Sequence, residues 1–304
     1  MEAALVLDDV TKRFGTKVAV DRLSLTIPRG SIYGFLGQNG AGKTTTIRMV
    51  MSIFYPDSGS ITVLGEPNAE HIKDRLGYLP EEKGLYKKMR ANEIITYFGR
   101  LKGLDGATAR RRADDMLERY GLGDAKDKRC ESLSKGMGQK VQVLAALIHE
   151  PELVILDEPF SGLDPVNREL MRDLIRGMKE QGRTVIFSTH EMEMAEQLCD
   201  FLFLIHHGKK VLDGPLSQIK ASSEHGIQLD YDGDGRLLRT LPGVVRVNDS
   251  GKTAELFLAP GADPQAVLAA LVGRISVRRF DLREPSLHEI FVRAVTGSGA
   301  SVHE

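Results

Sequence analysis

Hydrophobic residues in the first 220 positions follow two kinds of pattern. Short, nearly continuous apolar runs, typical of strands buried on both faces, occur in residues 31–37, 152–159 and 183–190. An amphipathic stretch with helical spacing covers residues 165–182, with a proline near its start and a glycine at its end. The order strand, helix, strand, helix predicts a parallel sheet covered by helices on both faces.

Other segments complete this first part of the chain. The opening, residues 4–37, mixes alternating and continuous apolar runs and predicts several short strands. Residues 43–54 have helical spacing directly after a glycine-rich turn, and residues 138–149 and 191–200 predict two further helices. From about residue 91 to 129 the pattern is helical and polar, which indicates a separate helical region.

The pattern changes after residue 220. Residues 220–226 form a small polar stretch that predicts a linker. Beyond it, the order strand, short helix, strand, strand, helix, strand, helix resembles a split βαβ, ferredoxin-like unit. The expected strands are 227–231, 244–248, 254–258 and 276–282, and the expected helices are 236–241, 263–273 and 286–295.

Composition restricts the class of protein. The chain has 304 residues, 41% hydrophobic and 27% charged, as in soluble globular proteins. A formal net charge of -1 gives no overall attraction to nucleic acid or anionic lipid. Two cysteines indicate a reducing compartment rather than a disulfide framework. The acidic first residues do not resemble a signal peptide, and no run approaches the roughly 18 apolar residues of a membrane span.

A phosphate-binding motif stands between an expected strand and an expected helix. The segment GQNGAGKT, Gly37 to Thr44, fits G-x-x-x-x-G-K-[ST]. Its glycines let backbone N–H groups surround a phosphate, and the following helix N-terminus adds partial positive charge. Lys43 can reach the β- and γ-phosphate oxygens, and the Thr44 hydroxyl can ligate Mg²⁺. The motif predicts a nucleoside triphosphate site.

Two adjacent carboxylates follow the buried run LVIL. Asp157 comes at the end of this expected strand, where it can hold the Mg²⁺ shell, and Glu158 can orient and polarise an attacking water. Taken by itself, an acidic pair at a strand end could equally well have a purely structural role, with no part in catalysis. The complete phosphate-binding motif upstream favours the catalytic interpretation.

These motifs, with several others in the same order, resemble the ATP-binding subunits of ATP-binding cassette (ABC) transporters over roughly residues 3–220. LSKGMGQK, residues 133–140, is similar to the family's signature Leu-Ser-Gly-Gly-Gln. SGLD, residues 161–164, matches its D-loop, and STH places His190 as the switch histidine. Phe14 stands where the family has an aromatic residue that stacks on adenine. Each piece is weak alone, but their order and spacing together are specific.

The resemblance implies a mechanism. Two copies would face head to tail, with each ATP between the phosphate loop of one and the signature of the other. Ser134 and the Gly136 amide, expected just before a helix, would face the γ-phosphate. Glu158 would be the general base or water-orienting residue, His190 would contact the γ-phosphate and the water, and Asp164 would couple the two sites.

The expected cofactors are ATP and Mg²⁺, and the expected activity is Mg²⁺-dependent ATP hydrolysis coupled to transport. The catalytic residues would be Lys43, Glu158 and His190. The nucleotide-binding residues would be Phe14, Val18, Gly37, Gln38, Asn39, Gly40, Ala41, Gly42, Lys43, Thr44, Thr45, Ser134, Gly136 and Asp164. The metal-binding residues would be Thr44, Asp157 and Glu81.

Two positions depart from the family pattern. YLPEE puts Glu81 where the family has the Q-loop glutamine, and a carboxylate oxygen can replace an amide oxygen at Mg²⁺. A surface carboxylate with no nucleotide role is the alternative. The signature has Lys135 and Met137 in place of Gly and Gln, while Ser134 and Gly136 are kept. YLPEEKGLY, LSKGMGQK and DEPFSGLDPVN together resemble ABC-2-type exporters, including the sodium-extrusion and drug-resistance groups.

The expected fold is α/β, with a P-loop NTPase core of the ABC ATPase type, a helical subdomain and a small α+β C-terminal domain. The expected boundaries are 1–220 for the ATP-binding domain, about 83–140 for its helical subdomain, 221–296 for the C-terminal extension and 297–304 for a disordered tail.

The expected partners are an integral-membrane permease and a second copy of the chain, with no direct binding of nucleic acid. The protein would lie at the cytoplasmic face of the cell membrane without a transmembrane segment of its own. Lys and Arg outnumber Asp and Glu over residues 83–129, which fits either a solvated helical face or a surface near anionic lipid. The alternatives are a soluble ABC ATPase acting on a ribosome or nucleic acid, and a non-hydrolysing binding module. The cargo stays open.

Overall fold

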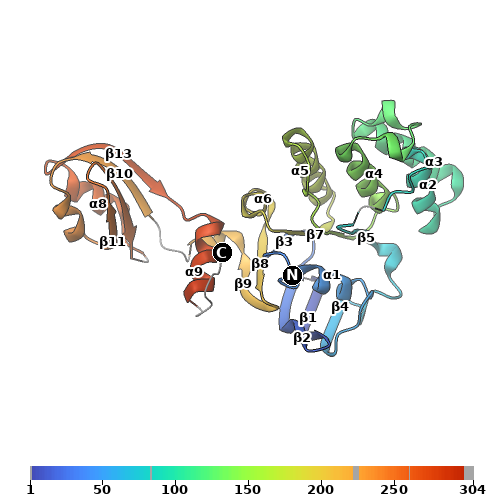
Figure 1. Ribbon diagram of the computed structural model, residues 1–304, viewed down its shortest axis with the longest axis horizontal. Helices are drawn as coiled ribbons and strands as arrows, with labels where there is room; N and C mark the ends of the chain where they lie inside the picture. The colour runs from blue at the N-terminus through green and yellow to red at the C-terminus, as the bar shows by residue number, and fades with distance from the viewer. Residues whose placement is uncertain (1, 83, 222–225, 260, 298–304) are drawn as a thin grey trace. The chain divides into compact units, whose positions relative to one another are not determined.

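The protein divides into two compact units, residues 1–213 and 214–304, in a computed structural model (Figure 1). The structure describes residues 2–82, 84–221, 226–259 and 261–297. The expected linker overlaps residues 222–225 and the expected tail overlaps 298–304, so both fall largely outside the described residues.

An antiparallel sheet of three strands opens the first unit. Its order is β2-β1-β4, and β1 pairs with both neighbours. The strands are β1 Ala3–Phe14, β2 Lys17–Pro28 and β4 Ser58–Val63. The register of the β1–β2 pair shifts at several points between Ala3 and Arg13. Next to the turn, Phe14 pairs with Lys17. This turn forms one wall of a cavity that Phe14 and Lys17 line.

A six-stranded sheet in the order β5-β6-β7-β3-β8-β9 forms the centre of this unit. The pairs from β5 to β8 are parallel, as the strand-helix order predicts. The strands are β3 Ile32–Leu36, β5 Leu76–Leu79, β6 Leu153–Leu156, β7 Thr184–Thr189, β8 Phe201–His206 and β9 Lys209–Pro215. All residues of β3, β6 and β7 are buried, which explains their continuous apolar sequence.

The two sheets share one hydrophobic core. It joins Leu5 and Val20 of the antiparallel sheet to Phe35 and Phe203 of the parallel sheet, with Ile47 of α1 (Lys43–Val50) in the same cluster. One face of the parallel sheet is therefore covered by α1 together with a second sheet. The prediction of helices on both faces of the parallel sheet is wrong for this face, where a second sheet takes the place of further helices. Alternation in β1 and β2 reflects a sheet with one side in this core.

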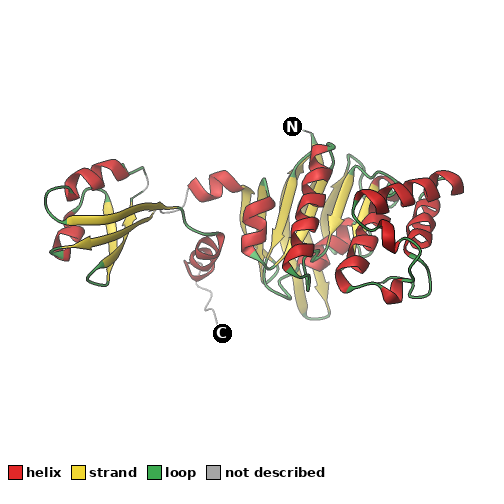
Figure 2. Ribbon diagram, turned by 90° about the horizontal axis from the view of Figure 1, so that it is seen from above, coloured by secondary structure: helices red, strands yellow, loops and turns green. Residues whose placement is uncertain are grey.

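Helices α5 and α6 pack on β7, and a separate group of helices lies beside β5 (Figures 1 and 2). In that group α2 contacts both α3 and α4. The remaining helices of the unit are α2 Ala91–Leu101, α3 Gly106–Arg119, α4 Lys135–Leu147, α5 Pro165–Glu180 and α6 Met192–Leu198. Short 3-10 turns lie at Lys73–Arg75, Gly123–Ala125 and Cys130–Ser132. Among the described residues, no helix has the length and apolar character needed to cross a membrane.

The two largest differences between the predicted and the observed helix ends concern α1 and α4. The helix expected at residues 43–54 ends at Val50, because Ser52 has a left-handed backbone with φ of 53°. The helix expected from residue 138 begins at Lys135, because Ser134 caps it by accepting a hydrogen bond from the Met137 amide at 3.2 Å. Gly136 therefore lies inside the first turn of α4 rather than before it.

The second unit has a four-stranded antiparallel sheet in the order β11-β12-β10-β13. In this order β12 separates β10 from β11, the arrangement of a split βαβ unit. Its core joins the sheet to the 3-10 helix and α8 through residues such as Leu229, Leu238 and Val267. The elements, preceded by α7 Leu216–Ala221, are β10 Gly226–Asp232, η4 Gly235–Thr240, β11 Val244–Asp249, β12 Thr253–Leu258, α8 Pro264–Leu271, β13 Ser276–Arg283 and α9 Leu287–Gly297.

Candidate nucleotide-binding site

The loop between β3 and α1 has the backbone that a phosphate-binding loop needs. Gly40 and Gly42 have left-handed φ values of 80° and 115°. A Cβ at Gly42 would lie 2.6 Å from the Ala19 carbonyl oxygen, so a larger residue would displace the loop. The Lys43 ammonium donates to the Gly37 carbonyl oxygen at 2.7 Å and bends back over the loop. Glycine is required here both for φ and for close approach.

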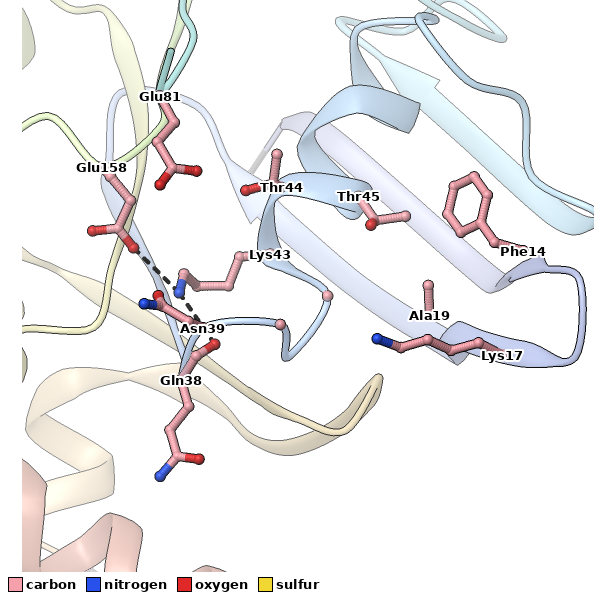
Figure 3. Close-up of a pocket in the computed structure, with 12 residues that line it drawn as sticks. Phe14, Lys17, Ala19, Gln38, Asn39, Lys43, Thr44, Thr45, Glu81 and Glu158 are labelled. Carbon is pink, nitrogen blue, oxygen red and sulfur yellow. Dashed lines mark hydrogen bonds and ion pairs between the residues drawn. The ribbon is translucent and has the colours of Figure 1, made fainter. Parts of the chain in front are cut away.

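A cavity of about 440 Å³ lies over this loop (Figure 3). The β1–β2 turn forms one side, the loop and the start of α1 form the floor, and two glutamates close the other side. Phe14 is 47% exposed at this wall, with its ring edge-on to Phe54 at 5.6 Å between centroids. The lining residues are Phe14, Lys17, Ala19, Gln38, Asn39, Gly40, Gly42, Lys43, Thr44, Thr45, Glu81 and Glu158.

Asp157 lies directly after β6 and is almost fully buried. Its Oδ1 accepts hydrogen bonds from the Ser188 hydroxyl at 2.5 Å and from the Thr44 hydroxyl at 3.4 Å. Its Oδ2 is buried without a hydrogen-bond partner among the described residues. Burial raises the pKa of Asp157, and the hydrogen bonds from Ser188 and Thr44 oppose that shift.

The orphaned oxygen of Asp157 beside the Thr44 hydroxyl fits a divalent cation. In proteins Mg²⁺ is held by one or two carboxylates together with substrate phosphates. The described part of the chain contains no group of three or more His, Cys, Asp or Glu side chains arranged for a metal. The donor set Thr44 and Asp157 therefore suits an ion whose other ligands are phosphate oxygens and water.

Glu158 occupies a strained position between two partners. Its φ of 50° lies in the left-handed region, which costs a residue with a Cβ on the order of 1 kcal/mol. Its amide donates to the Ser188 hydroxyl at 2.8 Å. Its carboxylate contacts the Lys43 ammonium at 3.2 Å and the His190 Nδ1 at 3.1 Å. Strain at a buried carboxylate facing a cavity is characteristic of a functional residue.

His190 follows β7, and its side chain is about half exposed. Because β6 and β7 are parallel neighbours, the residues after their carboxyl ends meet at one edge of the sheet. This geometry brings His190 to Glu158 although 32 residues separate them.

Glu81 lies two residues beyond β5 and lines the same cavity. Figure 3 shows its carboxylate directed into the space beside Thr44 and Glu158. The side chain is exposed. This position places a third carboxylate near the expected phosphate and metal positions.

The signature and D-loop residues are not among those that line this cavity. Ser134 is the N-cap of α4, and Asp164 is the N-cap of α5, where it accepts from the Asn167 amide at 3.0 Å. That backbone hydrogen bond lowers the pKa of Asp164. Gly136 packs against the Asn167 side chain, and a Cβ there would lie 2.5 Å from its Nδ2.

Some of the predicted loop residues act through their backbone rather than by lining the cavity. Gly37 supplies the carbonyl that accepts from Lys43. The Ala41 amide donates to the Gln38 carbonyl oxygen at 3.1 Å, and the Ala41 carbonyl accepts from the Gly208 amide at 2.8 Å. These bonds hold the loop in shape.

Sequence reasoning missed three residues of the site. Lys17 and Ala19 line the cavity, whereas Val18 between them on β2, which was assigned to the nucleotide, does not. Alternate residues of a strand point to opposite faces, so the strand pattern was the signal that could have found them. Ser188 was also missed. It bridges Asp157 and Glu158 from the neighbouring strand, and only the strand order reveals this.

Two family models match parts of this chain. Residues 20–161 match the family model "ABC transporter", and residues 214–295 match "ATP-binding protein DrrA1-3-like, C-terminal domain". The chain is similar to an uncharacterized ABC transporter ATP-binding protein, YhaQ, of Bacillus subtilis, with 43% identity over 96% of this chain and 98% of that protein. It is 37% identical to the Nod factor export ATP-binding protein I of Sinorhizobium fredii, over 96% and 86% of the two chains.

Among solved structures, the fold is similar to cbiO1 from Clostridium perfringens, described as part of the ABC transporter complex cbiONQ. The TM-score is 0.66 and the identity 26%, over 73% of this chain and 92% of that one. The predicted fold class, a P-loop α/β core with a further C-terminal domain, is confirmed by this similarity.

Proposed function

Because this chain belongs to the ABC transporter family as an ATP-binding subunit, we propose that it hydrolyses ATP to drive an ABC-2-type exporter. The match of its second unit to DrrA-like proteins and the similarity to a Nod factor export subunit fit the exporter branch. The observation that carries hydrolysis is the Glu158 carboxylate, held at the cavity between Lys43 and His190.

In the proposed reaction, Glu158 orients the attacking water and accepts its proton. His190 is within hydrogen-bond reach of that carboxylate and holds its direction. Lys43 has its ammonium over the loop that would surround the β-phosphate, so it neutralises phosphate charge. Thr44 and Asp157 would hold Mg²⁺, which neutralises the charge of the phosphate oxygens when bound. Phe14 forms the apolar wall against which the adenine ring would lie.

We propose that two copies act head to tail, each nucleotide lying between the cavity of one copy and the signature of the other. Ser134 is exposed at the start of a 13-residue helix. Its hydroxyl accepts a hydrogen bond from Met137 and keeps its own proton to donate. Ser134 lies at a helix N-terminus and outside the cavity of its own chain, which supports the proposal that it binds the phosphate of a nucleotide held by the second copy.

We expect Glu81→Ala to raise the Mg²⁺ concentration needed for half-maximal ATP binding. Glu81 lines the cavity near Thr44, and removing an exposed carboxylate contact should cost on the order of 1 kcal/mol, or roughly fivefold. Titration of Mg²⁺ against a fluorescent ATP analogue measures this. Glu82→Ala, which removes the exposed neighbouring carboxylate, is the matched control. If both variants needed the same Mg²⁺ concentration, Glu81 would be a surface carboxylate with no role at the nucleotide.

The partner is expected to be a separate integral-membrane permease, because the chain is an ATP-binding subunit of the ABC transporter family and resembles a subunit of the cbiONQ transporter complex. Affinity purification of the tagged protein from solubilised membranes should recover a polytopic membrane protein. ATP with Glu158→Gln should increase that recovery by stabilising the nucleotide-bound state. Recovery with ribosomes or nucleic acid, and never with a membrane protein, would overturn the transport proposal.

A further inference from the structure

One face of helix α4 contacts the loop that follows Glu158. We call residues 159–164 the post-β6 loop. The Gln139 side-chain amide donates to the Pro159 carbonyl oxygen, and Gln139 is almost fully buried. Lys135, one turn earlier, lies against Gly162. Residues four apart in a helix share a face, so these two contacts form one continuous attachment between α4 and the loop.

The contact between Lys135 and Gly162 depends on the absence of a side chain at Gly162. A Cβ placed there would lie 1.7 Å from the Lys135 Nζ and 2.7 Å from its Cε. Gly162 also has a left-handed φ of 67°. The end of the lysine side chain therefore lies over the glycine backbone, and a methyl group at residue 162 would push this exposed, flexible end aside.

A second contact of the same kind supports this attachment. Gly136 packs against the Asn167 side chain, and that side chain donates to the Asp164 carboxylate at 2.5 Å. Lys140 continues the same face of α4 and is 8% exposed. Burial lowers the pKa of the Lys140 ammonium, and the Asp164 carboxylate opposes that shift.

The post-β6 loop is continuous with the strained backbone of Glu158. The Ser161 amide donates to the Glu158 carbonyl oxygen at 3.2 Å, and the Leu163 amide donates to the Phe160 carbonyl oxygen at 3.2 Å. These turns make the loop a compact unit. A displacement of the loop therefore shifts the backbone of Glu158, whose carboxylate must stay between Lys43 and His190.

We infer that Lys135 is a positioning residue, which holds the post-β6 loop through Gly162 and so passes movement of α4 to Glu158. This inference rests on the proposed hydrolytic role of Glu158. It assigns a task to the residue by which this chain departs from the Leu-Ser-Gly-Gly-Gln pattern. Lys135 is exposed, but the end of its side chain lies over Gly162 of its own chain, so the part assigned to it here is the position of the loop.

The test is a double-mutant cycle of Lys135→Ala, Gly162→Ala and the two together, measured as steady-state ATP hydrolysis. Lys135→Ala should lower kcat roughly three- to tenfold, with KM for ATP changed less than about twofold. Gly162→Ala puts a methyl group where the lysine lies and should lower kcat at least as much. In the double variant the methyl group has room, so the loss should be clearly smaller than the product of the single losses.

Two results would overturn the inference. The first is a cycle in which the single losses multiply, which would show that Lys135 and Gly162 act independently. The second is a rise in KM for ATP with unchanged kcat in Lys135→Ala, which would show direct binding of phosphate. Lys88→Ala, an exposed lysine in the same helical region, should leave both constants unchanged.

Hydrogen exchange provides a test that needs no hydrolysis. The amides of Ser161 and Leu163 should exchange faster in Lys135→Ala than in the parent protein, measured without nucleotide. Unchanged exchange would contradict the contact even if Gly162→Ala failed to fold. A parent protein that hydrolyses no ATP would instead refute the proposed function, while the exchange result would still report on the loop.

Discussion

Glu158→Gln is expected to lower ATP turnover by at least about 100-fold while ATP affinity stays within a few-fold of the parent protein. Glutamine has nearly the same shape, so the amide hydrogen bond from residue 158 to Ser188 is kept. The substitution removes the ability to accept a proton from water. It also removes the negative charge that faces Lys43 at 3.2 Å, which should leave the ammonium freer to bind phosphate.

The measurement is phosphate release in single-turnover conditions, beside equilibrium binding of ATP. Size-exclusion chromatography with ATP should show a larger dimer fraction for Glu158→Gln, because bound nucleotide persists. Glu180→Gln, at the exposed end of α5, is the matched control and should behave like the parent. Turnover within about threefold of the parent would remove Glu158 from the catalytic role.

The parts of the site that depend on neighbouring residues were predictable, because short continuous segments of sequence contain all the residues that they require. The loop from Gly37 to Thr44 needs glycines for its backbone and a lysine and threonine for phosphate and metal. Each requirement acts over a few residues, between a strand and a helix that have strong patterns of their own. The buried strand before Asp157 was equally clear, since a short, wholly apolar run such as LVIL is typical of a strand covered on both faces.

The non-local part could not be predicted from patterns. Thr44 and Asp157 are 113 residues apart, and their contact depends on the strand order β6-β7-β3. Ser188 comes from the strand between them in the sheet, and nothing in its neighbourhood marks it as a bridge between the two acids. Its role follows from the register of parallel neighbours, which a single sequence does not contain.

The contacts of Lys135 show the same limit. The sequence showed only that Lys135 replaces a glycine of the signature. In the structure its side chain lies over Gly162, where the sequence pattern of neither segment gives a reason for contact. Lys135 therefore lies beside the loop that follows the acid and does not line the phosphate cavity of its own chain.

Lys43→Met should have two effects that can be separated. The ammonium makes the only charged contact with Glu158 apart from His190 among the described residues, and both Lys43 and Glu158 are buried. Loss of charge-assisted contacts to phosphate should weaken ATP binding roughly 100-fold, since such bonds contribute about 1.5–3 kcal/mol each. Without nucleotide, the uncompensated Glu158 carboxylate should lower the free energy of unfolding by about 2 kcal/mol.

Combining Lys43→Met with Glu158→Gln distinguishes these effects. The double variant no longer buries an unpaired carboxylate, so urea unfolding should show most of the lost stability restored. Its ATP affinity, measured by calorimetry, should stay low, because the phosphate contact is still missing. Lys17→Met is the matched control, since Lys17 lines the same cavity but is exposed, and it should weaken binding less than about tenfold. Equal losses of affinity in Lys17→Met and Lys43→Met would mean that general positive charge, rather than the position of Lys43 over the loop, binds the phosphate.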